Sequence, residues 1–374
     1  MRRLITLLTV VFAIAAAPAA RACTPEIVDL GQPDGADVSE VIAFGPHGEA
    51  GGDVVVDQHQ RAVLWRDGQI MDLGRGVVSD IDARGDVLVF DAEQAAAAIV
   101  EPSGRRRTLP GLRAGDQVYA RRMNDRGDVG GASFSPGQGE VAATPVVWRA
   151  GLEPRALEIP LGFSGGYVKG LDNAGDAVGG VELPTGETLA AEWDRSGAVR
   201  VLPTAYPSSP YDEANVVDAH GDVLGATESF NAFEAEATLW RDGARFGLGH
   251  LDGARYGVAL GINRHREAVG ADAGADGTPH AWITRLGERL RPLPALSGGT
   301  EGASIAHAIT DPVAGDVSAG GFSASVTGAN HATVWRCAFA LAREQAVAGT
   351  ARAHRTKPPR LLGSALHPFT QSNP

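Results

Sequence analysis

The sequence has little lysine, little cysteine and few long apolar stretches. Lysine occurs only at Lys169 and Lys357, and cysteine only at Cys23 and Cys337. The longest apolar stretch, from Leu4 to Ala17, has about 14 residues, whereas a helix that spans a bilayer needs roughly 20. We therefore predict no membrane span.

The first 22 residues have the three-part layout of a secretory signal peptide. Arg2 and Arg3 come before the apolar stretch, and Ala20-Arg21-Ala22 fits the small-x-small pattern of a cleavage site. The sequence therefore predicts a signal peptide at residues 1–22 and a secreted or periplasmic mature protein.

The formal net charge of -12 is unevenly distributed along the chain. Three arginines lie in the signal, and residues 338–374 carry a net charge of +4, so the residues between them carry -19. Nucleic acids and anionic membranes are bound by basic surfaces. The charge therefore argues against both as partners.

Self-similarity organises the chain, and its first landmark is a strand that ends in Trp, followed by a tight turn and a second strand. AVLWRDGQIMDLG at 62–74 is the clearest copy. The equivalent positions are Trp65, Val100, Trp148, Trp193, Trp240, Thr284 and Trp335. The chain therefore contains seven units.

The second landmark is an apolar strand, a Gly-Asp turn and another apolar strand, as in DIDARGDVLV at 80–89. It also occurs seven times, between successive copies of the first landmark. Each unit thus offers four short strands, which is the pattern of a propeller blade. We predict an all-β, seven-bladed β-propeller over residues 23–337; a β-solenoid or a pair of sandwiches is the alternative.

The repeats are cut inside a unit, and this predicts how the propeller closes. CTPEIVDLG at 23–31 matches the last strand of a unit, and ATVWRC at 332–337 matches the strand before it. Pairing of the N-terminal strand within the last blade would complete that blade and leave no bare sheet edge. Residues 338–374 show no repeat and are predicted to be a flexible basic tail.

The two cysteines lie at this junction. Cys23 comes just before the free last strand and Cys337 just after the free third strand, where the other units have a hairpin turn. Disulfides persist in exported proteins, so we expect a Cys23 to Cys337 bond. Two free thiols, or lipidation of Cys23, are the alternatives.

Several strings resemble the HAF-repeat family of probable extracellular proteins. They are HATVW at 331–335, PHAWI at 279–283, the DLG strings and LGINRHREAVGA at 260–271. The resemblance covers nearly all of residues 26–336 and implies an exported repeat protein. It carries over no catalytic residue. The chain departs from the family pattern because Trp282 and Thr333 stand where Phe would be.

Two kinds of connection lie on opposite faces of a propeller. The Gly-Asp turns and the turns after Trp lie on one face, which we call the turn face. Long, dissimilar loops lie on the other, the long-loop face, where binding is usually placed. The tyrosines fall on this long-loop face or at the strand starts that it feeds: Tyr119, Tyr167, Tyr206, Tyr211 and Tyr256. We predict them as ligand-binding residues, although capping of strands is an equal alternative.

Known catalytic and metal motifs are missing from the sequence. No GxSxG, SxxK or HExxH string holds up, and Asp272 to Gly277 has only part of a calcium-loop spacing. The two Arg-Gly-Asp strings, at 84–86 and 126–128, occupy the repeat's own turn and are interpreted as structural. We therefore predict no catalytic residue, no metal and no cofactor.

These observations favour a monomeric, non-catalytic binding module for a glycan or a protein. A glycan hydrolase or lyase with carboxylates at the channel mouth is a second hypothesis, with Asp212 and Glu213 among the candidates. A structural cell-surface repeat protein is a third.

Overall fold

The computed structural model describes residues 25–136, 143–150, 153–229, 234–274, 276–300, 302–313 and 316–336. The expected signal peptide, both cysteines and the C-terminal tail lie outside these residues. The described residues form 28 β-strands and no helix, so none of them forms an apolar helix of membrane-spanning length. The chain is all-β, as the strand patterns predicted.

The strands form groups of four antiparallel neighbours that follow the chain. The first groups are β2 (Ala36–Phe44), β3 (Ala50–Val56), β4 (His59–Arg66), β5 (Gln69–Arg75); β6 (Val77–Ile81), β7 (Val87–Asp91), β8 (Ala96–Val100), β9 (Arg106–Thr108); and β10 (Gln117–Met123), β11 (Val129–Phe134), β12 (Thr144–Trp148), β13 (Pro154–Ala156). Then come β14 (Gly165–Leu171), β15 (Ala177–Glu182), β16 (Thr188–Trp193), β17 (Val199–Val201); and β18 (Glu213–Val217), β19 (Val223–Ser229), β20 (Glu234–Arg241), β21 (Ala244–Gly247). The last are β22 (Tyr256–Ile262), β23 (Glu267–Ala273), β24 (Pro279–Arg285), β25 (Arg291–Pro292); and β26 (Ser304–Ile309), β27 (Ser318–Ala324), β28 (Asn330–Arg336), which share a sheet with β1 (Glu26–Asp29).

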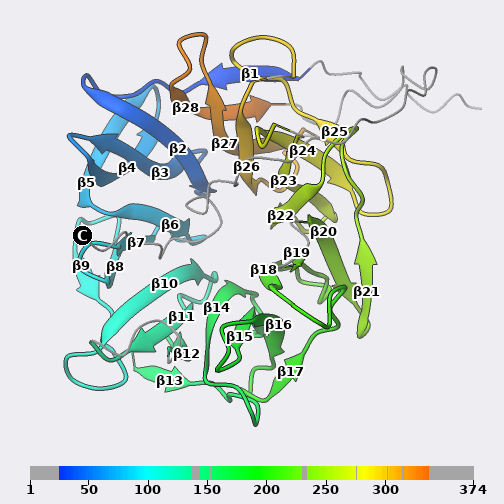
Figure 1. Cartoon of the computed structure of the whole chain (residues 1–374). Helices are drawn as coiled ribbons and strands as arrows, with labels where there is room; N and C mark the ends of the chain where they lie inside the picture. The colour runs from blue at the N-terminus through cyan, green and yellow to red at the C-terminus, as the bar shows by residue number, and fades with distance from the viewer. Residues whose placement is uncertain are drawn as a thin grey trace, which may run out of the picture.

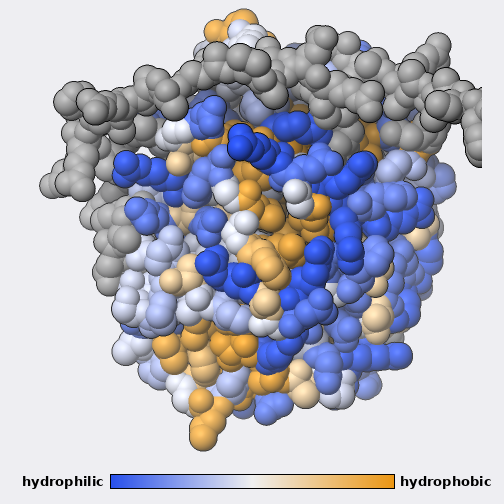
Figure 2. Space-filling view, turned by 90° about the vertical axis from the view of Figure 1, so that its right-hand side faces the viewer, coloured by the Kyte–Doolittle hydropathy of each residue, from blue (hydrophilic) through white to orange (hydrophobic). Residues whose placement is uncertain are grey.

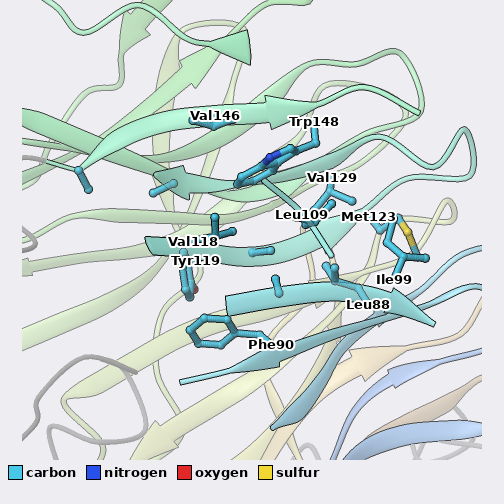
Figure 3. Packing of buried hydrophobic residues seen from close by; sticks show 14 residues of the cluster. Leu88, Phe90, Ile99, Leu109, Val118, Tyr119, Met123, Val129, Val146 and Trp148 are labelled. Atoms are coloured by element: carbon cyan, nitrogen blue, oxygen red, sulfur yellow. The ribbon is translucent and has the colours of Figure 1, made fainter. Parts of the chain in front are cut away.

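The groups are arranged in a circle, and the first strand of each lies nearest the central axis (Figure 1). A single parallel bridge, Ala235 to Tyr256, joins β20 to β22, so β18–β25 count as one eight-stranded sheet. Apolar side chains fill the space between neighbouring groups. Figure 3 shows one such core, where Phe90 of β7 packs against Tyr119 of β10 and Leu88 belongs to the same cluster.

The tryptophan landmark links neighbouring groups. The indole Nε1 of Trp148 donates to the carbonyl oxygen of Pro110, 2.7 Å away, just after the last strand of the preceding group. Trp193, Trp240 and Trp335 make the same bond at 2.7 to 2.8 Å. Because the acceptors lie 35 to 41 residues earlier in these three cases, each bond ties two groups together.

The Gly-Asp landmark is a turn stabilised by an Asn or Asp side chain. In one copy the Asn124 Oδ1 accepts from the backbone N–H groups of Arg126 and Asp128, both at 3.0 Å. Its Nδ2 donates to the carbonyl of Asp172 in the next group. Gly127, with φ of 77°, supplies the left-handed conformation that the turn requires. The Arg126-Gly127-Asp128 string therefore has a structural role, because the Asp128 carboxylate also pairs with Arg149 at 3.1 Å.

The N-terminal strand lies beside the C-terminal one. β1 pairs antiparallel with β28, and Glu26 is opposite Arg336. The Trp65 Nε1 donates to the carbonyl of Gly31 at 3.1 Å, the bond that other groups make to the strand group before them. Figure 2 shows the outer side that carries β21 and β25, where apolar residues gather in the centre between hydrophilic ones. The exposed Phe246 belongs to β21.

Candidate functional site

Each strand nearest the axis contains a β-bulge at an equivalent position. The register between first and second strands skips one residue, for example between Ala120 and Arg122. A bulge leaves the extra residue out of the ladder and re-aims its side chain. The skipped residues are Ile42, Ser79, Arg121, Lys169, Asn215, Leu260 and His307. Three of them carry basic side chains at the centre of the molecule.

Lys169 pairs with a carboxylate of the next group. Its Nζ lies 2.5 Å from the Glu213 Oε2, while the Tyr167 hydroxyl donates to Oε1 at 2.6 Å. The Lys169 side chain is only 11% exposed, so burial lowers the pKa of its ammonium, against the opposing effect of Glu213. Burial also raises the pKa of Tyr167 well above its usual range, and the charge of Glu213 adds to it. Tyr167 therefore stays a neutral hydrogen-bond donor.

His307 makes the equivalent contact on another side of the axis. Its Nε2 lies 3.1 Å from the Glu40 Oε2, and Glu40, like Glu213, stands two residues before a bulge. Asp53 lies opposite Glu40 in the register of β2 and β3. Burial, followed by the charge of Glu40, raises the pKa of Asp53 well above normal. Burial opposes ionisation of Glu40, but His307 and other partners lower its pKa. The pKa values of these two neighbouring carboxyls are therefore shifted in opposite directions.

Arg121 is the third basic residue at a bulge position. Among the described residues its guanidinium forms no hydrogen bond and no ion pair. Burial is the main influence on the pKa of Glu40, Asp53 and Lys169, and the charge of Arg121 acts on all three. We call Glu40, Asp53, Arg121, Lys169, Glu213 and His307 the axial cluster.

Two further carboxyls lie beside Glu213 at the long-loop end of β18 and β19. The Asp212 Oδ1 accepts from the backbone N–H of Glu228 at 3.2 Å. Burial raises the pKa of Asp212 to about 6. Burial and the charges of Glu213 and Asp212 raise the pKa of Glu228 to about 7. We call Asp212 and Glu228 the rim carboxyls; they exchange protons near neutral pH.

The predicted tyrosines lie in two places. Tyr167 contacts Glu213. Burial is the main cause of the raised pKa values of Tyr206 and Tyr256; the charge of Asp212 adds to the first, and the charge of Glu228 adds to the second. The Tyr211 N–H donates to the Glu228 carbonyl at 2.9 Å. Tyr167 therefore lies beside Glu213, and the Tyr211 backbone lies beside Glu228. Tyr119 instead is 2% exposed and packs edge-on against Phe90, with ring centroids 5.2 Å apart.

The turn face holds a cavity of about 500 Å³ on the axis. It is lined by the ends of the strands nearest the axis and by the turns that follow them, with His307 among the lining residues. Apolar side chains such as Met123 and Ile262 alternate there with polar ones such as Asp80 and Arg122. Sequence reasoning had assigned binding to the long-loop face alone and did not predict this cavity.

Sequence reasoning named Glu213 as a candidate but missed the rest of the axial cluster. Its members lie in six short strands, most of them far apart in the chain, and the circular arrangement of the strand groups brings them together. A signal was present, because Lys169 is one of two lysines and interrupts an apolar strand. The partial calcium string has other contacts, since Asp272 accepts from the Leu251 N–H at 2.6 Å and contacts His250. No group of potential metal ligands occurs in the described ranges.

Comparison with known proteins shows the fold and no family. No protein-family model matches the chain, and no curated protein matches its sequence. Virginiamycin B lyase from Staphylococcus aureus has a similar structure, with a TM-score of 0.55 and 10% identity, covering 84% of this chain and 98% of the lyase. An oligogalacturonate lyase in complex with manganese gives 0.58 and 9%, covering 83% and 93%. The β-propeller domain of the Trilobed protease from Pyrococcus furiosus gives 0.52 and 11%, covering 80% and 94%. The chain therefore has the all-β architecture of the β-propeller proteins.

Proposed function

We propose that this protein is an exported β-propeller that binds a glycan at the axial end of its long-loop face. The observation that carries the proposal is that Tyr167 contacts Glu213 and the Tyr211 backbone contacts Glu228 beside the rim carboxyls. The charges of the rim carboxyls also act on Tyr206 and Tyr256. Tyrosine rings offer flat amphipathic contact area, and carboxylates accept hydrogen bonds from sugar hydroxyls. A protein ligand is the alternative outcome of the experiment below.

The site has a polar and an apolar side, which suits a sugar ring. Tyr167, Lys169 and Glu213 form a hydrogen-bonded set on β14 and β18. Leu260, the partly buried bulge residue of β22, is the apolar side chain that such a site offers, and it packs against the buried Val258 and Ile305. A sugar presents hydroxyls at its edge and carbon-bound hydrogens on its faces. The polar side of the site can therefore bind the hydroxyls, and the apolar side can contact a face of the ring.

A glycan array with the purified protein tests this proposal. We expect selected glycans to bind, and Tyr256→Ala to weaken their binding about tenfold or more, since losing one aromatic contact costs roughly 1–2 kcal/mol. His265→Ala, in an exposed turn on the opposite face, is the control and should bind normally. An array with no selective binding, or equal loss in both variants, would count against the site.

We also propose the finer architecture: seven blades, with the two halves of β18–β25 as separate blades and β1 completing the last one. Only one bridge joins those halves. The pairing of β1 with β28 and the Trp65 bond to Gly31 support closure by the N-terminal strand. Export through the signal at residues 1–22, membership of the HAF-repeat family and the Cys23 to Cys337 bond belong to the same proposal.

Hydrolysis or elimination of a glycan is a second candidate function, favoured by the rim carboxyls. Glu228 and Asp212, with pKa values of about 7 and 6, retain protons near the operating pH beside Glu213. A proton donor beside an ionised carboxylate is the arrangement that glycosidases use. Product formation from array-positive glycans, lost in Glu228→Gln with binding retained, would make the protein an enzyme. Binding without turnover in the wild type would leave the binding function.

A further inference from the structure

We propose that Arg121 anchors a carboxylate of the bound ligand, which makes the preferred glycan an acidic one that contains uronic acid. This inference rests on the proposed glycan-binding function and adds the chemical class of the ligand.

Two of the basic bulge residues have an acidic partner built into the protein. Lys169 contacts Glu213 and His307 contacts Glu40, and both partners stand two residues before the bulge of the following group. The position equivalent to those partners for Arg121 is Tyr167, two residues before the bulge at Lys169. Tyr167 carries no charge, and its hydroxyl already donates to Glu213. Arg121 therefore lacks the counter-ion that the repeat provides elsewhere.

Arg121 stands at the bulge of β10, the strand of its group that lies nearest the axis (Figure 1). Arg121 belongs to β10, and its charge acts on Lys169 of the next group and on Glu40 and Asp53 of β2 and β3. The group of β6–β9 lies between β10 and the strands that carry Glu40 and Asp53 (Figure 1). The electrostatic interaction of Arg121 with Glu40 and Asp53 therefore crosses the centre of the circle. The side chain is also half-buried, so a bound anion would meet it partly shielded from water.

A carboxylate is the anion that fits these surroundings. The guanidinium is a planar fork whose N–H groups match the two oxygens of a carboxylate. Glu40 and Glu213 lie in the same cluster, and the body of the chain carries -19 of formal charge, so a doubly charged phosphate meets more repulsion than a singly charged carboxylate. Among glycans, uronic acids carry that carboxylate next to a sugar ring.

The experiment compares free uronic acids with their methyl esters, which differ only in the charge and in the methyl group on one oxygen. The probes are tri-galacturonate and its fully methyl-esterified form, measured by calorimetry with the full mature chain. We expect the free acid to bind at least about tenfold more tightly than the ester, because a charge-assisted hydrogen bond contributes roughly 1.5–3 kcal/mol. Arg121→Ala should abolish this difference, and Arg121→Lys should restore part of it.

Arg155→Ala is the matched control, since Arg155 is an exposed arginine on β13, the outermost strand of the same group. It should bind the acid like the wild type, and unchanged thermal midpoints should show that all three variants fold. Equal binding of acid and ester, no binding of the acid, or an Arg121→Ala variant that keeps the preference would overturn the inference. Displacement of the acid by millimolar inorganic phosphate would overturn the choice of carboxylate.

The outcomes separate this inference from the function beneath it. The protein could bind neutral glycans on the array, with Tyr256→Ala abolishing this binding and Arg121→Ala leaving it unchanged. That result would support the glycan site and contradict the role of Arg121 as a carboxylate anchor. If Tyr256→Ala and Arg121→Ala both leave glycan binding intact, the proposed site itself is wrong.

Discussion

At the scale of single residues, the buried tryptophans differ in the hydrogen bonding of their indole nitrogens. Some donate a hydrogen bond to the neighbouring strand group, whereas one contributes packing alone. Trp148 is fully buried and donates to the Pro110 carbonyl, whereas Trp282 is equally buried and its Nε1 has no partner among the described residues. Substitution by Phe removes similar volume at both sites. It removes a hydrogen bond only at Trp148.

We therefore expect Trp148→Phe to lower the free energy of unfolding by about 1 kcal/mol more than Trp282→Phe, the net contribution of one hydrogen bond. Urea unfolding of both variants measures the difference. Equal losses would mean that the indole bonds contribute nothing beyond packing.

Glu228 gives a pH dependence whose sign follows from its raised pKa. Its folded-state pKa of about 7 exceeds the ordinary value of 4.5, so the folded protein binds this proton more tightly than the unfolded chain. The group's contribution is most favourable below pH 4.5 and is lost as the pH rises through 7. We expect the free energy of unfolding of the wild type to fall by on the order of 2 kcal/mol between these two pH values because of this group. The Glu228→Gln variant should not show this fall. Urea titrations from pH 4.5 to 8 measure it, with the exposed Glu158→Gln as control. A wild-type curve parallel to that of Glu228→Gln would refute the shift.

At the scale of strands and turns, the sequence predicted what is local. The Gly-Asp strings became turns because Asn124 and its equivalents bond within four residues, and such short-range chemistry is visible in a string of letters. The bulges were not predicted. A bulge such as that at Arg121 depends on which residue of the neighbouring strand stands opposite, and the apolar pattern leaves that register open by one residue. The partner of Trp148 lies 38 residues away in another group, so its role was equally out of reach.

The strand β1 offers a test at this scale. The Leu30 N–H, just beyond its end, donates to the Ala332 carbonyl at 2.9 Å, and proline lacks this donor. We expect Leu30→Pro to lower the free energy of unfolding by about 3 kcal/mol or more relative to the wild type. Leu30→Ala keeps the donor and loses only partly buried packing, so it serves as the control in the same urea experiment. Similar values for the two variants would show that the ladder to β28 adds little.

At the scale of the whole molecule, the candidate site arises from the circular arrangement. Arg121, Lys169 and His307 each sit in a separate group, and no one group contains both a basic bulge residue and its acidic partner. The sequence predicted the repeats and the tyrosine-rich face, but the convergence at the axis needed all groups in place. Anything that opens the circle should therefore weaken ligand binding together with stability.

The junction of the two chain ends is the place to test that coupling. Glu26 stands opposite Arg336 in the pairing of β1 with β28. In the sequence, Cys23 comes three residues before Glu26, and Cys337 comes one residue after Arg336. A bond between them would close a loop of 315 residues and stabilise the folded state by on the order of 5 kcal/mol, because the unfolded chain loses that much conformational freedom. We expect peptide mapping without reductant to find the two cysteines linked. Cys337→Ser, or added dithiothreitol, should lower the thermal midpoint and weaken glycan binding, while the Cys23→Ser, Cys337→Ser double variant should be no worse than either single one. Unlinked cysteines, or a reduced protein as stable as the oxidised one, would show that pairing of β1 with β28 holds the ends together without a covalent bond.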